Sequence, residues 1–275
     1  MAQQFPALSE LGQGETAVLL LHGIGGGRSI WSDTGSDTLR ALADAGYRAL
    51  AIDLPGYGDS QGFGTPDMDG FVAAVRAVMA HAAAQGARRS VLLGHSMGGM
   101  VAQELVARDA SGVQGLILTC TSASFGKSDG AWQAQFLADR LAPLDAGLGM
   151  AGVADRLVPG MVSPEAPASA LQTAREVMSR VPEATYRAAL QAIAGFDSRA
   201  TLPAISVPTL LLAAEHDRTA PSELMQRMAA RIVGSEYHCL AHAGHIANVE
   251  APATFNAAVL SFLQRRFPQP YSSAV

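Results

Sequence analysis

The feature that most constrains this chain is a serine between glycines, placed between an apolar run and a helical pattern. Residues 94–98 read Gly-His-Ser-Met-Gly. They directly follow the buried-strand run Val91–Leu93 and directly open a segment with apolar residues at helical spacing. A turn this sharp strains the serine backbone and requires small neighbours. The pattern predicts that the Ser96 side chain is exposed at the carboxyl end of a sheet, where a helix N-terminus favours a developing negative charge.

Apolar runs alternate with helical patterns along most of the chain. Continuous runs of this kind are typical of parallel strands that are covered on both faces. The predicted strands are Ala17–Leu21, Ala49–Ile52, Val91–Leu93, Leu116–Leu118, Thr209–Leu212 and Glu236–Leu240. Strands separated by helices favour right-handed βαβ units. We therefore expect an α/β fold with a mostly parallel central sheet and helices on both faces.

The alternation stops in the middle of the chain. Between residues 125 and 197 there is no strand-like run, and short helical segments rich in Ala, Met and Leu are separated by prolines, which end one helix and begin the next. This pattern predicts an inserted helical cap at 125–197 between two parts of one core, residues 1–124 and 198–275. Ligands are expected to bind between cap and core.

A serine hydroxyl is a poor nucleophile unless a base takes its proton. His245 is the preferred candidate, because it follows the last predicted strand in a Gly-His loop and should lie at the same sheet edge as Ser96. His242 is the close competitor. His22 is expected to brace its own loop by hydrogen bonds, and His95 to pack behind the nucleophile.

The base in turn needs a carboxylate that fixes its orientation. Asp217 follows the strand Thr209–Leu212, and Glu215 is the alternative. The order Ser96, Asp217, His245 along the chain matches one known arrangement of such triads.

A tetrahedral intermediate needs two N–H donors. The backbone N–H of Met97, directly after the serine, is one candidate. The other is expected in the glycine-rich loop at 22–27, where glycines let the backbone turn an amide toward the oxyanion. We assign this donor to Ile24, with Gly25 as second choice. The loop has neither a P-loop nor a Rossmann pattern.

Together these motifs resemble the α/β-hydrolase superfamily over nearly the whole chain, including residues 53–60, Asp-Leu-Pro-Gly-Tyr-Gly-Asp-Ser. The resemblance implies a serine hydrolase with the triad Ser96, Asp217 and His245 and no cofactor. Residues 196–209 and 244–252 are similar to 3-oxoadipate enol-lactone hydrolases and related small-ester hydrolases. The implied reaction is cleavage of a small carboxylic ester or lactone through an acyl-enzyme, with an enol-lactone of aromatic degradation as one candidate substrate.

Other activities of the same superfamily stay open. Carbon–carbon hydrolases of the meta-cleavage type tend to carry Asn before the nucleophile and Trp after the base, where this chain has His95 and Ile246. A cofactor-free perhydrolase shares the same three residues. A ligand receptor on a hydrolase fold often lacks one of them.

An acidic substrate requires a cation in the pocket. Arg28, beside the glycine-rich loop, is one candidate, and the cap supplies Arg140, Arg156, Arg175, Arg180 and Arg187. Trp31, Trp132 and Phe136 are candidate apolar lining residues, although core packing explains each of them as well.

Composition limits the remaining function classes. The net charge of −5 argues against nucleic acid or an anionic membrane as a partner. The histidines do not show zinc-ligand spacing, so no metal is expected. The two cysteines, Cys120 and Cys239, do not form a disulfide framework, and the first ten residues do not resemble a signal peptide. We expect a cytoplasmic protein that acts on a small molecule; the sequence gives no indication of its oligomeric state.

Overall fold

In the part of the chain that the structure describes, the fold is built around a seven-stranded sheet. The computed structural model describes residues 5–32, 36–125 and 131–269, with only the backbone of residues 131 and 132. The strands are β1 (Leu8–Leu11), β2 (Thr16–Leu21), β3 (Arg48–Ile52), β4 (Arg89–His95), β5 (Val113–Thr119), β6 (Thr209–Ala214) and β7 (Glu236–Leu240). They lie in the order β1-β3-β2-β4-β5-β6-β7, and all neighbours except β1 and β3 are parallel.

The six strands that the sequence predicts are all present. Every residue of β2, β3 and β6 is buried, as continuous apolar runs require in a sheet covered on both faces. Strand β1 was not predicted. It is a half-buried Leu-Ser-Glu-Leu segment at the sheet edge, and its antiparallel pairing with β3 places Leu8 opposite Ile52. Four residues with two polar members carry too little periodicity to reveal a strand.

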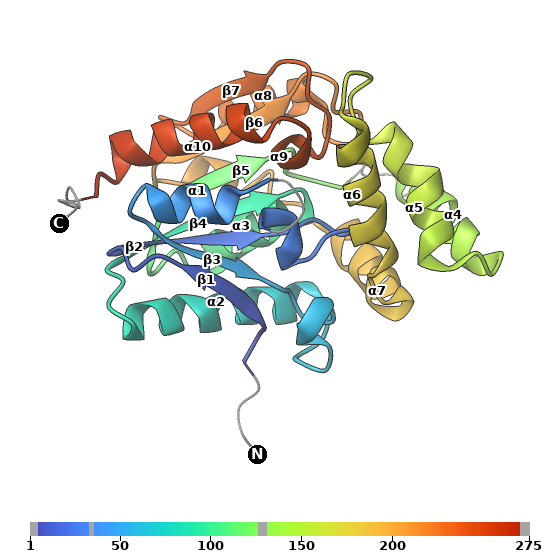
Figure 1. Cartoon of the computed structure of the whole chain (residues 1–275), viewed down its shortest axis with the longest axis horizontal. Helices are drawn as coiled ribbons and strands as arrows, with labels where there is room; N and C mark the ends of the chain where they lie inside the picture. The colour runs from blue at the N-terminus through green and yellow to red at the C-terminus, as the bar shows by residue number, and fades with distance from the viewer. Residues whose placement is uncertain (1–4, 33–35, 126–130, 270–275) are drawn as a thin grey trace.

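Helices cover both faces of the sheet (Figure 1). The core helices are α1 (Thr38–Asp44), α2 (Met68–Ala84), α3 (Met97–Arg108), α8 (Ser222–Ala229), α9 (Ala247–Glu250) and α10 (Pro252–Arg266). Helix α1 contacts α10, and α2 contacts α3. Large side chains such as Phe71 of α2 and Phe255 of α10 are fully or almost fully buried. Among the described residues, no helix combines the length and apolarity needed to cross a membrane.

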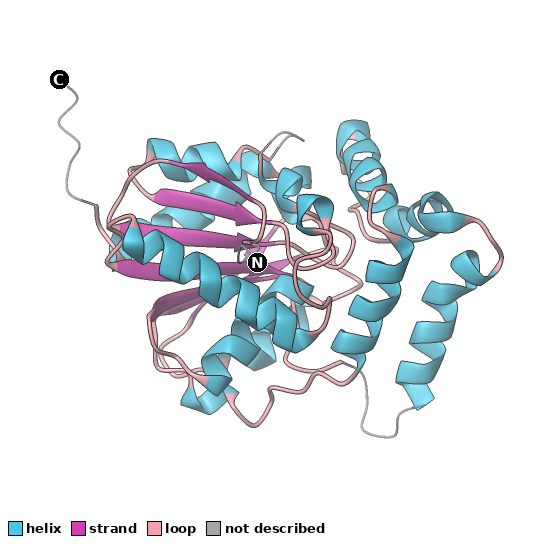
Figure 2. Cartoon of the chain, turned by 90° about the horizontal axis from the view of Figure 1, so that it is seen from below, coloured by secondary structure: helices cyan, strands magenta, loops and turns pink. Residues whose placement is uncertain are grey.

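Within the described residues, four further α-helices form a group, called the cap below, that stands beside one end of the sheet (Figures 1 and 2). They are α4 (Ala131–Asp145), α5 (Gly149–Leu157), α6 (Ala168–Ser179) and α7 (Glu183–Ala194). The two ends of this insertion meet, because Ser124 and Asp197 form an isolated antiparallel bridge. The N–H of Ser198 donates to the carbonyl of Ala123 at 2.7 Å, directly outside that bridge. These helices occupy the segment where the sequence predicts a cap.

Candidate active site

Ser96 lies in a strained turn between β4 and α3. Its φ of 52° and ψ of −117° fall in a region that non-glycine residues rarely adopt. The N–H of Ser96 donates to the carbonyl of Thr119, and the hydroxyl of Thr121 donates to the Ser96 carbonyl at 2.7 Å, so the end of β5 and the loop after it hold the turn. A side chain at Gly94 would lie 2.4 Å from the carbonyl oxygen of Gly98. Gly94 is therefore required for the close approach of β4 and α3, and a side chain at Gly98 would lie 2.3 Å from the carbonyl oxygen of Leu21 in β2.

Three side chains from separate loops form a hydrogen-bonded line at the carboxyl edge of the sheet. His245 Nε2 lies 3.1 Å from Ser96 Oγ, and His245 Nδ1 lies 2.8 Å from Asp217 Oδ2. The side chains of His245 and Asp217 are 2% and 0% exposed, so water does not compete for their hydrogen bond. The sequence-predicted residues are thus brought together in the expected order.

The carboxyl group of Asp217 is held in its charged form. Burial on its own would raise its pKa, but the charge and hydrogen bond of His245 outweigh it. The N–H groups of Thr219 and Ala220 both donate to Oδ1 at 2.8 Å. The net effect is a lowered pKa. The alternative acid Glu215 points elsewhere, because it is exposed and accepts the N–H of His242.

Hydrogen bonds from the side chains of His22 and Tyr57 fix the backbone of the glycine-rich loop. His22 is fully buried, donates from Nδ1 to the Gly23 carbonyl and accepts the N–H of Leu54 at Nε2. This pair of bonds requires the neutral ring, and burial lowers the pKa of His22 accordingly. The hydroxyl of Tyr57 donates to the carbonyl of Ile24 at 3.1 Å. The bracing role expected for His22 is what the structure shows.

The loop that carries His245 is organised by two further side chains, His95 and Glu250. The ring of His95, beside the nucleophile, donates from Nε2 to the carbonyl of His245 at 2.8 Å. Glu250 accepts the N–H groups of Gly244 and Ile246, on either side of the base, at 2.9 and 3.0 Å. It also accepts the N–H of Ser163 from the cap at 2.7 Å.

Two cavities reach the Ser96 side chain. The larger has a volume of about 770 Å³ and lies between core and cap. The smaller, about 40 Å³, is lined by the glycine-rich loop at 23–26 and by apolar cap residues that include Val177 and Met178. Five residues line both: Ile24, Ser96, Met161, Met178 and His245. The candidate oxyanion donors therefore border the site, since Ile24 and Gly25 line the smaller cavity and Ile24 and Met97 the larger.

The larger cavity is lined by three arginines, Arg140, Arg156 and Arg218. Among the described residues, no Asp or Glu side chain lines this cavity, and no carboxylate oxygen lies within 4.0 Å of these guanidinium nitrogens. Arg140 is half-buried, and its guanidinium carbon lies 3.3 Å from the centroid of the Phe136 ring. The cavity that Ser96 lines thus carries three guanidinium groups, of which Arg140 is half-buried and Arg156 and Arg218 are exposed.

The other arginines predicted as candidates are bound to acidic residues. Arg175 pairs with Asp155, Arg180 with Glu176, and Arg187 with both Asp145 and Glu183. Arg28 pairs with Asp53 and Asp59 and lines a different cavity from those at Ser96.

Of the aromatic side chains considered for the pocket, the structure places one in the cavity lining and one in the core. Phe136 lines the larger cavity, as expected. Of the two roles considered for Trp31, the structure shows core packing: this side chain is fully buried, its ring centroid lies 6.3 Å from that of Phe255, and it lines neither cavity at Ser96. Its ring packs in the apolar core, and its buried indole N–H has no hydrogen-bond partner among the described residues. Trp132 was also a candidate, and its side chain lies outside the described part of the structure.

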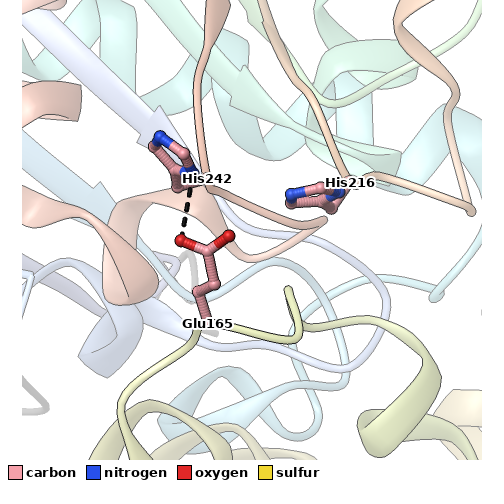
Figure 3. Close-up of side chains that lie close together, drawn as sticks. All are labelled: Glu165, His216 and His242. Carbon is pink, nitrogen blue, oxygen red and sulfur yellow. Dashed lines mark ion pairs between the residues drawn. The ribbon is translucent and has the colours of Figure 1, made fainter.

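The competitor base His242 lies in a different cluster. Its Nδ1 is 3.0 Å from Glu165 of the cap, and His216 faces the same pair (Figure 3). The possible ligand atoms of these three residues all lie within 4.8 Å of one another. Sequence spacing gave no indication of this group, because each residue comes from a different loop.

Sequence reasoning also missed three residues at the site. Arg218 directly follows Asp217, and no sequence pattern marked it as a residue of the cavity lining. Tyr57 and Glu250 lie in the segments 53–60 and 244–252 that carry the family resemblance, which is where a search for positioning residues could have begun.

A strained serine turn, a histidine and an aspartate at the carboxyl edge of a mostly parallel sheet, beneath an inserted helical cap, define the class of capped α/β hydrolases. A sequence model of the Alpha/beta hydrolase family matches residues 18–258. The chain belongs to this family, and the fold and resemblance expected from the sequence are confirmed.

The relatives of the chain are hydrolases that act on different bonds. A protein of Variovorax paradoxus (strain S110) named as a carbamate hydrolase, RutD, is 33% identical over 90% of this chain and 92% of its own. A 2-hydroxy-6-oxononadienedioate/2-hydroxy-6-oxononatrienedioate hydrolase of a Pseudomonas species is 31% identical over 94% and 91%. The crystal structure of the enol-lactonase from Burkholderia xenovorans LB400 is 25% identical, with a TM-score of 0.79 over 94% of this chain and 96% of that chain.

Proposed function

We propose that this α/β hydrolase cleaves a small carboxylic ester or lactone that carries a negatively charged group, through an acyl-enzyme on Ser96. The observation that supports the reaction type is the line of hydrogen bonds from Ser96 through His245 to Asp217, at 3.1 and 2.8 Å. This is the arrangement by which a serine hydroxyl becomes a nucleophile.

In the proposed reaction, Ser96 Oγ forms a bond to the carbonyl carbon while His245 Nε2 takes the hydroxyl proton. Asp217 stabilises the resulting imidazolium, and the N–H groups of Met97 and Ile24 donate to the oxyanion. The bond to the leaving oxygen then breaks, and that oxygen takes the proton from His245. In a lactone, the leaving oxygen stays on the acyl group.

Deacylation repeats these steps with water. A water molecule attacks the acyl carbon and gives a proton to His245, and the proton passes to Ser96 as the acid product leaves. All proton transfers use the same imidazole, and no step requires an external oxidant or cofactor.

The charge of the substrate is inferred from the larger cavity. Its volume of about 770 Å³ contains three arginines, and among the described residues no acidic side chain lines it. Guanidinium groups form strong, often bidentate hydrogen bonds with carboxylates. We therefore place a carboxylate of the substrate in this cavity, and a small apolar part of the substrate in the cavity of about 40 Å³.

Carbon–carbon hydrolysis is the second candidate, because the relative that is 31% identical is named for a dienedioate, which is also a dianion. His95 and Ile246 stand where the meta-cleavage hydrolases tend to carry Asn and Trp. The ring of His95 is committed to the carbonyl of His245. These two positions favour the ester or lactone.

The test is a comparison of substrates with wild type and Ser96→Ala. The substrates are 3-oxoadipate enol-lactone, p-nitrophenyl acetate and a meta-cleavage dienedioate, each with and without hydrogen peroxide. We expect many turnovers of the lactone without peroxide and none by the variant. Fastest cleavage of the dienedioate would replace the ester with a carbon–carbon bond. Peroxide-dependent product would indicate a perhydrolase, and a single turnover would indicate a receptor.

A further inference from the structure

A second group of chemically active side chains lies outside the hydrolase site. Glu165, His216 and His242 offer one carboxylate oxygen and two imidazole nitrogens within 4.8 Å of one another. Figure 3 shows Glu165 and His242 joined by their 3.0 Å contact and His216 facing them from the neighbouring loop. We propose that these three residues bind a divalent transition-metal ion of the zinc type, which fastens the cap to the core.

The donor set selects the class of metal. Two histidines and one glutamate form a common three-ligand zinc site, with water in the fourth position. Ligands at ~2.0–2.2 Å around a tetrahedral ion lie roughly 3.3 Å apart, so the three donors need only small side-chain rotations to converge. Mg²⁺ and Ca²⁺ prefer oxygen ligands and are disfavoured by the two imidazoles.

Backbone hydrogen bonds fix the loops that carry the three donors. The N–H of His216 donates to the carbonyl of Ala243 at 2.8 Å, which joins the loops after β6 and β7. The N–H of His242 donates to Glu215 at 2.9 Å. In the cap, the N–H of Glu165 donates to Ser163 Oγ at 3.1 Å. The donors are therefore presented by loops that are already in place, which reduces the ordering required on binding.

The local charge favours a cation. Glu165 and Glu215 both lie beside the histidines, and the Glu215 carboxylate is 4.0 Å from His216 Nε2. The two carboxylates carry opposite charge to a divalent ion, and the imidazoles bind such an ion in their unprotonated form. All three donor residues are at least partly accessible, so an ion can enter from solvent.

The site connects two parts of the fold. Glu165 precedes α6 of the cap, whereas His216 and His242 follow strands β6 and β7 of the core. His216 directly precedes Asp217, and His242 lies three residues before His245. A bound ion would thus connect the cap segment before α6 to the two core loops that carry Asp217 and His245. This inference rests on the metal donors and is independent of the proposed reaction.

The experiment titrates Zn²⁺ into tag-free protein that has been freed of metal by chelation and dialysis, with calorimetry and thermal unfolding as readouts. We expect one Zn²⁺ per chain and a rise in Tm of roughly 5 °C at a hundredfold excess over Kd. Mg²⁺ should not compete. Cobalt(II) in place of zinc should give the visible absorption bands of a four-coordinate site.

Variants separate this site from other histidines. His216→Ala, His242→Ala and Glu165→Gln should each weaken zinc binding by at least about tenfold. His238→Ala, which alters an exposed histidine of β7 outside the cluster, and Ser96→Ala should bind zinc as wild type does. The proposal is overturned if no saturable binding occurs below about 100 μM zinc, or if the three cluster variants keep wild-type affinity. Because Ser96→Ala retains the metal donors, failure of the hydrolase proposal would leave this result unaffected.

Discussion

The carboxylate of Glu250 accepts the backbone N–H of Ser163 at 2.7 Å, across the boundary between core and cap. The same oxygen, Oε2, accepts the N–H of Gly244, and Oε1 accepts the N–H of Ile246. Burial raises the pKa of Glu250 despite these three donors. One acidic side chain therefore sets the position of the cap loop and of the loop that carries the base.

Glu250→Gln should impair both stability and activity. All three partners of the carboxylate are N–H donors, so the amide of glutamine places its own N–H₂ against at least one of them. Loss of charged, buried hydrogen bonds should cost about 2–4 kcal/mol in the free energy of unfolding. Urea unfolding and the kcat for an ester substrate measure the two effects, with the exposed Glu223→Gln as the matched control. Equal behaviour of the two variants would contradict the role assigned to Glu250.

Asp217→Asn should lower kcat while leaving the fold intact. The amide cannot hold the imidazole as a carboxylate does, and turnover should fall about 10²–10⁴-fold. Glu215→Gln is the control, because Glu215 was the alternative acid, and its carboxylate instead accepts a hydrogen bond from the N–H of His242. Its kcat should stay within about twofold of wild type. A large loss in Glu215→Gln with activity retained in Asp217→Asn would reverse the assignment.

Arg140→Gln should weaken selection for negatively charged substrates. Loss of one charge-assisted hydrogen bond of about 1.5–3 kcal/mol lowers kcat/KM roughly 10–100-fold. The effect should appear with 3-oxoadipate enol-lactone and be small with neutral p-nitrophenyl acetate. Arg187→Gln is the control, since Arg187 is paired with Asp145 and Glu183. A similar loss for both substrates would mean that Arg140 acts through the packing of the cap.

Stability should fall in acid because of buried His95. Burial is the main cause that lowers its pKa from the usual 6.5 to about 3, and the charge of His245 adds to it. Between these pH values the unfolded chain binds a proton at residue 95 that the folded chain does not. The free energy of unfolding should therefore decrease by about 1.4 kcal/mol for each pH unit lost below 6.5.

His95→Asn isolates this contribution, because its amide can still donate to the carbonyl of His245 but does not titrate. Urea unfolding of wild type and variant at pH 7, 6 and 5 gives two slopes whose difference is the His95 effect. Parallel curves would show that His95 does not carry the acid sensitivity.

The sequence predicted the sheet and the nucleophile turn well because both depend on local patterns. Val91–Leu93 is a continuous apolar run of the kind found in strands covered on both faces, and Gly94 and Gly98 allow the close approaches that the following turn requires. The identity of the pocket cations could not be predicted in this way. Arg140 and Arg187 both lie on cap helices, and their roles differ only through the orientation of those helices against the core.

For the same reason, the sequence could not predict the core position of Trp31 or the grouping of Glu165, His216 and His242. A tryptophan near a glycine-rich loop suits a pocket or a core equally well, and its burial against Phe255 comes from α10, more than two hundred residues away. Glu165, His216 and His242 have no sequence spacing in common, because their proximity follows from the pairing of β6 with β7 and from the position of the cap.

The bridge between Ser124 and Asp197 has an evolutionary consequence. Because the insertion leaves and re-enters the core at neighbouring points, its length and sequence can change without altering the register of any core strand. The proposed catalytic residues then lie in the core, whereas much of the cavity lining, including Arg140 and Arg156, lies in the insertion. We expect that exchange of residues 125–196 between relatives transfers selectivity for the substrate, while the serine turn and its partners stay as they are.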